Sequence, residues 1–182
     1  MTASQRINTV FFDVETQRLA DEVGGWHNVA KMGMAAAVTY SSESSTFRRF
    51  TEELVTELVA ELQSADVVVG FNVLRFDYVV LQPYSEVDLQ RLPTVDMLED
   101  IYRQLGFRVG LDSLAAATLG SSKLADGLQS VSWYKQGRID DVLAYCEEDV
   151  KITRDLFEFG RIHKYLQFRD RSRRLKRVPV SW

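Results

Sequence analysis

The amino-acid sequence predicts an α/β protein in which a mixed five-stranded sheet is flanked by helices. Three observations predict this class. The first apolar segments have the composition of consecutive strands, two of which are joined by a short polar turn. Strand and helix patterns alternate afterwards, and 182 residues with 46% hydrophobic positions suffice for one ordinary domain over 1–182. Antiparallel strands followed by such alternation indicate a sheet that contains both strand directions.

The first three strands are predicted from β-branched and aromatic segments. Asn8–Val14 shows no helical period and predicts the first strand. A loop that contains Gly24-Gly25 follows it. Met34–Tyr40 and Thr46–Phe50 flank the serine-rich turn Ser41–Ser45. Because this connection is short, we expect these two strands to form an antiparallel hairpin.

A helix and a buried strand come next. Thr51 is a suitable N-cap, and leucines at every fourth position after it predict an amphipathic helix to about Ser64. The apolar, β-branched run Asp66–Phe71 predicts a strand that is covered on both faces.

The rest of the chain alternates helical and extended patterns. Four further helices are expected, at Phe76–Leu81, Met97–Leu105, Leu111–Leu119 and Ile139–Phe159. Pro83 is expected to stop the first of them, and a brief strand is expected at Thr94–Val95. Gly120–Gly137 is expected to be irregular. Lys164–Phe168 and Leu175–Val180, separated by a charged turn, predict a C-terminal β-hairpin.

Charge is divided unevenly along the chain. Residues 1–160 contain 14 Lys and Arg against 25 Asp and Glu, whereas the basic C-terminal extension 161–182 contains 8 against one. Such an extension is either a solvated, frayed terminus or a surface for phosphate groups. Six basic side chains are the candidates for phosphate contact: Arg169, Arg171, Arg173, Arg174, Lys176 and Arg177.

Composition excludes several classes of protein. A single cysteine, Cys146, excludes an internal disulfide and a cysteine-built zinc site, and two histidines argue against Ser–His or Cys–His catalysis. The longest charge-free run, Met32–Ser42, has eleven residues, where a membrane span needs about 20. With no basic-then-apolar leader, we expect a cytoplasmic protein without a signal peptide or a membrane partner.

Carboxylates interrupt three apolar segments. Asp13 and Glu15 are two residues apart at a strand end, so they project from the same face. Asp77 follows the predicted strand Asp66–Phe71. Asp149 lies four residues after Tyr145 on the longest predicted helix, on the same helix face. Like charges brought together in this way require a cation.

Oxygen-only ligands suit Mg²⁺ or Mn²⁺, and carboxylates around two such ions, about 3.5–4 Å apart, suit phosphodiester hydrolysis. The tyrosine hydroxyl would hold the attacking water in line. Each pattern alone also fits a structural role: a strand-end turn, a helix cap or a surface hydrogen bond. Their coincidence in one chain favours a metal site.

The three segments resemble the motifs of a nuclease superfamily. F-F-D-V-E-T at 11–16, G-F-N-V-L-R-F-D at 70–77 and Y-C-E-E-D at 145–149 are similar to the motifs of the DEDD 3′-to-5′ exonucleases. The tyrosine marks the tyrosine-bearing branch, since Ala144 stands where the other branch has histidine. L-G-F-R-V-G-L-D-S-L-A at 105–115 also resembles stand-alone exonucleases of this type. The resemblance implies a ribonuclease H-like fold.

The resemblance also implies roles for individual residues. Four carboxylates would hold two divalent cations, Mg²⁺ or Mn²⁺: Asp13, Glu15, Asp77 and Asp149. Tyr145 would orient the water, and the main chain near Thr16 and the side chain of Asn72 would lie near the terminal nucleotide. The spacing from Asn72 to Asp77 is one residue longer than in the shortest form of the motif. The implied substrate is the 3′ end of single-stranded DNA or RNA, which would release 5′-mononucleotides.

Other residues keep two interpretations each. Lys123 and Arg138 would contact phosphates or belong to solvated surface. Trp26, beside His27 after two glycines, would stack on a base or, more in keeping with its size, anchor its loop onto the core. Two other functions remain open: a non-catalytic nucleic-acid-binding module, and a structure-specific endonuclease on the same fold.

Overall fold

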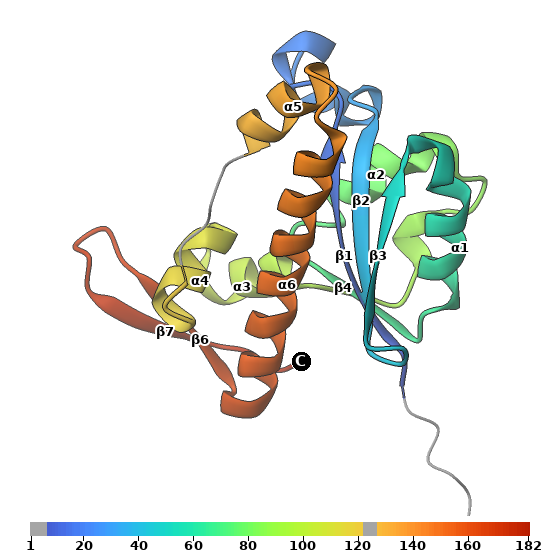
Figure 1. The fold of residues 1–182 in the computed structure, drawn as a ribbon. Coiled ribbons are helices and arrows are strands. Elements are labelled where there is room, and N and C mark those ends of the chain that lie inside the picture. Colours follow the sequence, from blue (N-terminus) through green and yellow to red (C-terminus); the bar gives the residue numbers. More distant parts are fainter. Residues whose placement is uncertain (1–6, 122–126) are drawn as a thin grey trace, which may run out of the picture.

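The computed structural model describes residues 7–121 and 127–182. Within these residues, five strands form one sheet in the order β3-β2-β1-β4-β5 (Figure 1). Its strands are β1 Thr9–Thr16, β2 Met34–Ser41, β3 Thr46–Thr51, β4 Val67–Gly70 and β5 Thr94–Asp96. β1 pairs antiparallel with β2 and parallel with β4, so the predicted mixed sheet and its hairpin are confirmed.

Helices cover both faces of this sheet. Their bounds are α1 Val55–Ser64, α2 Asp77–Leu81, α3 Met97–Leu105, α4 Leu111–Thr118, α5 Gly127–Lys135 and α6 Ile139–His163. A second, two-stranded sheet of β6 Tyr165–Arg169 and β7 Leu175–Pro179 confirms the expected C-terminal hairpin. None of the helices in the described ranges combines the length and the apolar character that crossing a bilayer requires.

The central strand β1 divides the core in two by alternation of its side chains. Val10 and Phe12 pack with the buried residues of α1 and α2. Phe11 points to the other face and packs with the buried residues of α6. Because strand side chains alternate, Asp13 and Glu15 lie on the same face as Phe11, toward α6.

The long helix α6 is confirmed and continues to His163, beyond the predicted end at Phe159. Its predicted stripe is buried, with no residue more than 9% exposed: Val142, Cys146, Val150, Thr153 and Phe157. Lys164 adopts a left-handed conformation, with φ 64°, and ends the helix. The chain then turns directly into the hairpin.

Several local predictions were wrong. Gly120–Gly137 is not irregular throughout, because α5 occupies Gly127–Lys135. Its buried residues are only Ser130 and Val131, so no apolar stripe marked the helix in the sequence. The predicted loop at Gly24-Gly25 contains 3₁₀ turns at Asp21–Val23 and Trp26–Lys31.

One predicted helix cap is absent, whereas one predicted helix end is confirmed. The Thr51 side chain makes no capping bond: a 3₁₀ turn at Glu52–Leu54 precedes α1, and the Thr51 hydroxyl donates to Glu53 at 2.6 Å instead. The predicted end of the next helix is confirmed: α2 ends at Leu81, and Pro83 lies at the start of a separate 3₁₀ turn, Gln82–Tyr84. Proline is tolerated there because the first N–H groups of a helical turn need no partner within it.

Candidate metal centre

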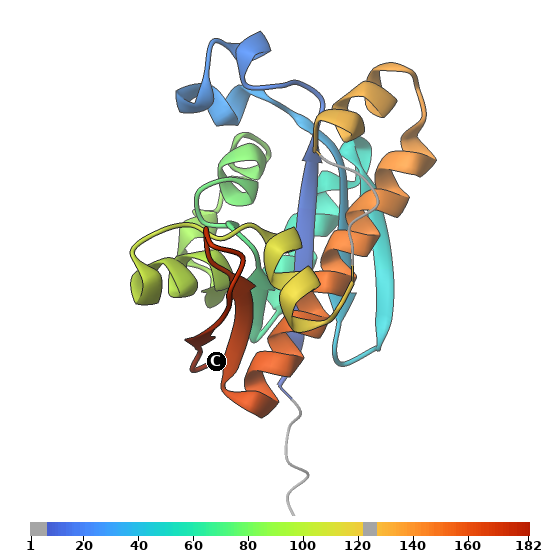
Figure 2. The same cartoon turned by 90° about the vertical axis from the view of Figure 1, so that its left-hand side faces the viewer.

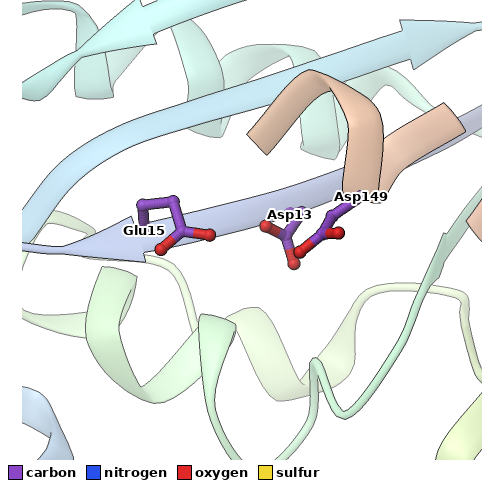
Figure 3. A group of neighbouring side chains, drawn as sticks. All are labelled: Asp13, Glu15 and Asp149. Atoms are coloured by element: carbon purple, nitrogen blue, oxygen red, sulfur yellow. The ribbon is translucent and has the colours of Figure 1, made fainter. Parts of the chain in front are cut away.

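Three carboxylates meet between β1 and α6. Asp13 and Glu15 come from one face of β1, and Asp149 comes from the facing side of α6 (Figure 3). One oxygen atom from each lies within 4.8 Å of the other two. Glu15 is 8% exposed and Asp149 is 5% exposed. An arrangement of buried carboxylate oxygens matches the ligand preference of Mg²⁺ or Mn²⁺.

Asp77 joins this site from α2, which follows β4, the parallel neighbour of β1. It begins α2, shortly after the end of β4, and it is 2% exposed. Its Oδ1 atom accepts a hydrogen bond from the backbone N–H of Val14 at 2.9 Å. Burial, followed by repulsion from Asp13, holds the pKa of Asp77 well above its ordinary value of 3.8. A cation is the group that would relieve this cost.

These side chains open into a pocket of about 520 Å³. Asp13, Glu15, Asp77 and Tyr145 line its polar part. Its apolar wall contains Trp26, Phe71, Phe76, Leu128 and Val131. Asp149 lies behind this surface, beside Asp13 and Glu15. The pocket therefore combines a group of acids with an apolar, mostly aromatic wall. Its volume lies in the range found for small-molecule sites.

Tyr145 is held as a neutral phenol. Burial, followed by the charges of Asp149, Glu15 and Asp13, raises the pKa of its hydroxyl far above the ordinary value, and the hydroxyl is hydrogen-bonded to Asp149. Its ring packs edge-on against Trp133 of α5, with centroids 6.3 Å apart. Tyr145 can therefore orient a water molecule, but it cannot serve as a base near neutral pH.

Cys146 contacts Asp13 from the next position of α6. Its thiol lies 3.2 Å from the backbone oxygen of Asp13 and 3.5 Å from its Oδ2 atom. Burial, followed by Asp13, raises the pKa of this thiol well above the ordinary value, so the thiol stays protonated and donates. The sequence placed Cys146 only in the apolar stripe, because nothing local reveals which atom of β1 it meets.

The predicted substrate residues are distributed more widely. Thr16 is buried and lines the pocket, and its hydroxyl donates to the backbone oxygen of Arg18 at 3.0 Å. Asn72 does not line this pocket: its Oδ1 accepts from Arg108 at 2.7 Å, and its backbone N–H donates to Asp96 at 2.9 Å. The structure thus brings only Thr16 of this pair to the carboxylates.

Neither of the two residues predicted to contact phosphates is found in the pocket lining. One lies elsewhere on the protein, and the other lies outside the described residues. Arg138 precedes α6, pairs with Asp141 at 2.7 Å and lies over the Trp133 ring. It does not line the pocket. Lys123 lies outside the described residues. The sequence did not single out Arg18, which does line the pocket and donates to the backbone oxygen of Lys31 at 2.6 Å.

The expectation that Trp26 anchors its loop in the core was wrong. Its side chain is 71% exposed and its ring lies 6.4 Å from that of Phe76 at the pocket wall. Val29 and Met32, 7% and 2% exposed, anchor the segment instead. Aliphatic residues therefore attach the loop to the core and leave the indole ring at the mouth of the site.

Two variants separate the charge of Asp77 from its hydrogen bond. In the absence of divalent ions, Asp77→Asn is expected to raise the melting temperature by a few degrees, because an amide oxygen still accepts from Val14 and carries no charge. The folded-state pKa is raised, so wild-type stability falls as the pH rises above about 3.8. The advantage of the amide should therefore grow between pH 4 and 7.

Asp77→Ala is the matched comparison. It also removes the charge but leaves the buried Val14 N–H unsatisfied, at a cost of about 1–3 kcal/mol, so it should melt at a lower temperature than Asp77→Asn at every pH. Thermal unfolding in EDTA across this pH range measures both variants. Equal destabilisation by Asn and Ala would contradict the assigned charge cost.

Comparison with known proteins places the fold. A family model of the RNase H superfamily matches residues 10–159. No curated protein matches the chain.

One similar solved structure is the family B DNA polymerase from the hyperthermophilic archaeon Pyrobaculum calidifontis, with a TM-score of 0.66 and 18% sequence identity. The match covers 86% of this chain but 25% of the polymerase chain. At this identity the similarity establishes a shared fold.

Proposed function

The chain belongs to the RNase H superfamily, and from this premise we propose that it is a metal-dependent 3′-to-5′ exonuclease of the tyrosine-bearing DEDD type. It would hydrolyse the last phosphodiester bond of a single-stranded end and release a 5′-mononucleotide. The observation that carries the proposal is the convergence of Asp13, Glu15 and Asp149 beside Asp77 and Tyr145. The polymerase that shares this fold acts on nucleic acid, which supports the same substrate class here.

The residues present fit two divalent cations, Mg²⁺ or Mn²⁺. We assign their ligands to the four acids Asp13, Glu15, Asp77 and Asp149. When bound, such ions would increase the acidity of the attacking water and neutralise charge on the leaving 3′ oxygen. Sulfur and imidazole are absent from this set of oxygen donors, and such a set disfavours zinc.

Tyr145 would position the attacking water. As a neutral phenol hydrogen-bonded to Asp149, its hydroxyl has a fixed place beside the acids. The edge-on contact with Trp133 restricts the ring. This preorganisation would align the water with the phosphorus atom, and an alignment error of about 1 Å costs about 100-fold in rate.

The pocket wall would enclose the terminal nucleotide. Trp26 and Phe76 provide aromatic surface next to the acids, and Leu128 closes the wall from α5. Walls that surround one nucleotide favour action at an end over an internal cut. This arrangement supports the exonuclease over the endonuclease alternative.

A time course tests the proposed reaction. Single-stranded DNA and RNA, each labelled at the 5′ end, are incubated with Mg²⁺ or Mn²⁺ and the wild-type chain or Asp77→Asn. We expect a ladder that shortens from the 3′ end with the wild-type chain and intact substrate with the variant. Internal fragments would indicate an endonuclease. Binding without any product would indicate a non-catalytic module.

Tyr145→Phe is expected to lower kcat by about 10- to 100-fold while KM stays within about twofold, since the ring and its packing remain and only the hydroxyl is lost. Single-turnover rates and strand affinity, measured separately, provide the test. Tyr134→Phe on the neighbouring helix α5 is the control and should leave both unchanged. A fall in affinity alone would contradict the water-orienting role.

A further inference from the structure

The C-terminal hairpin gathers most of the positive charge of the extension on an exposed surface. Its six basic side chains are all exposed: Arg169, Arg171, Arg173, Arg174, Lys176 and Arg177. Among the ion pairs between described residues, Arg174 alone of these six contacts an acid, Asp170, at 3.6 Å. The remaining five carry charge that no carboxylate of the described chain neutralises by direct contact. We call these six side chains the basic hairpin surface.

The hairpin is packed against the body of the protein, which excludes the frayed terminus, one of the two interpretations of the basic extension. Leu166, Phe168 and Val178 are at most 5% exposed and belong to the core beneath α6. The Thr118 hydroxyl of α4 donates to the Gln167 backbone oxygen at 3.1 Å and accepts from its N–H at 2.9 Å. These contacts fix the position of the hairpin, from which the basic side chains project.

An exposed aromatic ring lies beside this charge. Phe107, after α3, is 50% exposed and packs edge-on against Phe168, with centroids 5.9 Å apart. Lys176 is the cross-strand partner of Phe168, so its side chain projects from the same face of the hairpin. Arg177, the next residue, projects from the opposite face, where it lies over the Tyr165 ring at 4.1 Å, so the basic hairpin surface extends over both faces of the hairpin. A ring available for stacking next to a cation is the combination found in sites for single strands.

The basic hairpin surface and the metal centre lie on the same side of the main sheet. Both belong to the layer built around α6, with α5 at one end of the helix and the hairpin at the other (Figures 1 and 2). From Asp149 to His163, α6 rises by roughly 21 Å at about 1.5 Å per residue. At about 3.4 Å per nucleotide along a stacked strand, this is roughly six nucleotides.

We propose that the basic hairpin surface and Phe107 form a second site for single-stranded nucleic acid, which holds the strand several nucleotides to the 5′ side of the end in the pocket. The cations would contact phosphates, and Phe107 would stack on one base. Because the body of the chain is acidic, this surface would supply the phosphate affinity that the metal centre lacks. The assignment of the bound end rests on the proposed function; the binding surface does not.

The first test measures binding without hydrolysis. Fluorescence anisotropy in EDTA compares fluorescein-labelled dT4 and dT15 on the wild-type chain and on Arg171→Gln/Lys176→Gln/Arg177→Gln. For dT15 we expect weaker binding and a loss of about two from the slope of log affinity against log salt concentration, at about 0.7 per phosphate contact. For dT4, which can occupy the basic hairpin surface but is too short to reach the pocket as well, we expect weaker binding than for dT15 and a loss in the same direction.

A matched control removes the same charge elsewhere. Arg49→Gln/Arg91→Gln/Lys151→Gln replaces three exposed cations of β3, a 3₁₀ turn and α6. It should leave the affinity for dT15 nearly unchanged. Equal weakening by the two triple variants would reduce the effect to net charge and overturn the proposal. Thermal unfolding of both variants confirms that they fold.

The stacking contact has its own test. Phe107→Leu keeps an apolar side chain against Phe168 but removes the ring, and we expect about 5- to 150-fold weaker binding of dT15. Phe107→Tyr keeps the ring and should restore binding. Two results together would show that the single-strand assignment is wrong and that the surface binds duplex. The first is normal binding of dT15 by Phe107→Leu. The second is an equal loss of affinity for dT15 and for a 15-base-pair duplex in the hairpin triple variant.

The outcomes of these experiments distinguish a failure of the second binding site from a failure of the proposed exonuclease activity. If the hairpin variants bind dT15 as tightly as the wild-type chain does, the second site is overturned, but the proposed exonuclease activity is not. Hairpin-dependent binding without any 3′ degradation in Mg²⁺ or Mn²⁺ would support the surface and overturn the proposed reaction. Failure of the wild-type chain to bind dT15 and U15 in EDTA would overturn the second site, and the time course in Mg²⁺ or Mn²⁺ would still decide the proposed reaction.

Discussion

Asp13→Asn is expected to remove nuclease activity while leaving the fold intact. Asp13 is the acid that most of the site shares: its oxygen lies within 4.8 Å of those of Glu15 and Asp149, and its charge raises the pKa of Asp77. Loss of a group that only supports a metal ligand costs about 10- to 100-fold, so loss of a ligand itself should cost more than about 100-fold. Initial rates at saturating Mg²⁺ and Mn²⁺ measure this effect.

Stability measurements separate the metal-binding role of Asp13 from a structural one. Without divalent ions, the variant should be at least as stable as the wild-type chain, because one of several clustered negative charges is gone. Added Mn²⁺ should raise the wild-type melting temperature, since a ligand of the folded state stabilises it, and should raise that of the variant much less. Asp140→Asn, on the exposed first turn of α6, is the control and should behave as wild type. Near-normal turnover by Asp13→Asn would refute metal ligation.

Gly70→Ala is expected to be the most destabilising small substitution near the site. Gly70 ends β4, and an added Cβ atom would overlap the Cγ1 atom of buried Val73 and lie 3.2 Å from the backbone oxygen of Phe12. Neither neighbour is the free end of a flexible side chain. Overpacking of this kind costs about 3 kcal/mol, which corresponds to roughly 6–12 °C in melting temperature for a chain of this size.

A second substitution tests the stated cause. Val73→Ala removes the overlapping atom, so the double variant Gly70→Ala/Val73→Ala should be more stable than the sum of the single effects predicts. Gly110→Ala is the matched control, because no atom lies within 4 Å of its added Cβ. It should cost no more than about 1 kcal/mol, because Gly110 is the N-cap of α4, where alanine is only moderately less favourable than glycine. Simple additivity of the two changes in the free energy of unfolding would rule out the steric explanation.

Local patterns predicted much of the candidate site. The two-residue spacing of Asp13 and Glu15 places both on one face of a strand whatever surrounds that strand. The four-residue spacing of Tyr145 and Asp149 does the same on a helix, and their buried stripe was confirmed. Where the periodicity was weak, as in α5 with its two buried residues, the prediction failed.

The remaining features depend on contacts between distant parts of the chain. No spacing indicates that Arg108 reaches Asn72, that Phe107 covers Phe168, or that the hairpin packs beside α4. Trp26 illustrates the same limit, because whether a large ring is buried depends on which neighbouring side chains occupy the core beneath its loop. Val29 and Met32 fill it here.

The sequence by itself determined the mixed sheet, the order of its elements and the acids that face one side of β1, because periodicity is a local property of the backbone. Only the tertiary structure decided that α6 crosses β1 where Asp149 meets Asp13 and Glu15, with Cys146 donating to Asp13. It also decided that the basic extension forms a packed hairpin on the same side as the acids. The first arrangement follows from packing between segments more than a hundred residues apart, and the second from packing of the hairpin on α4, 49 residues away. No local pattern specifies either.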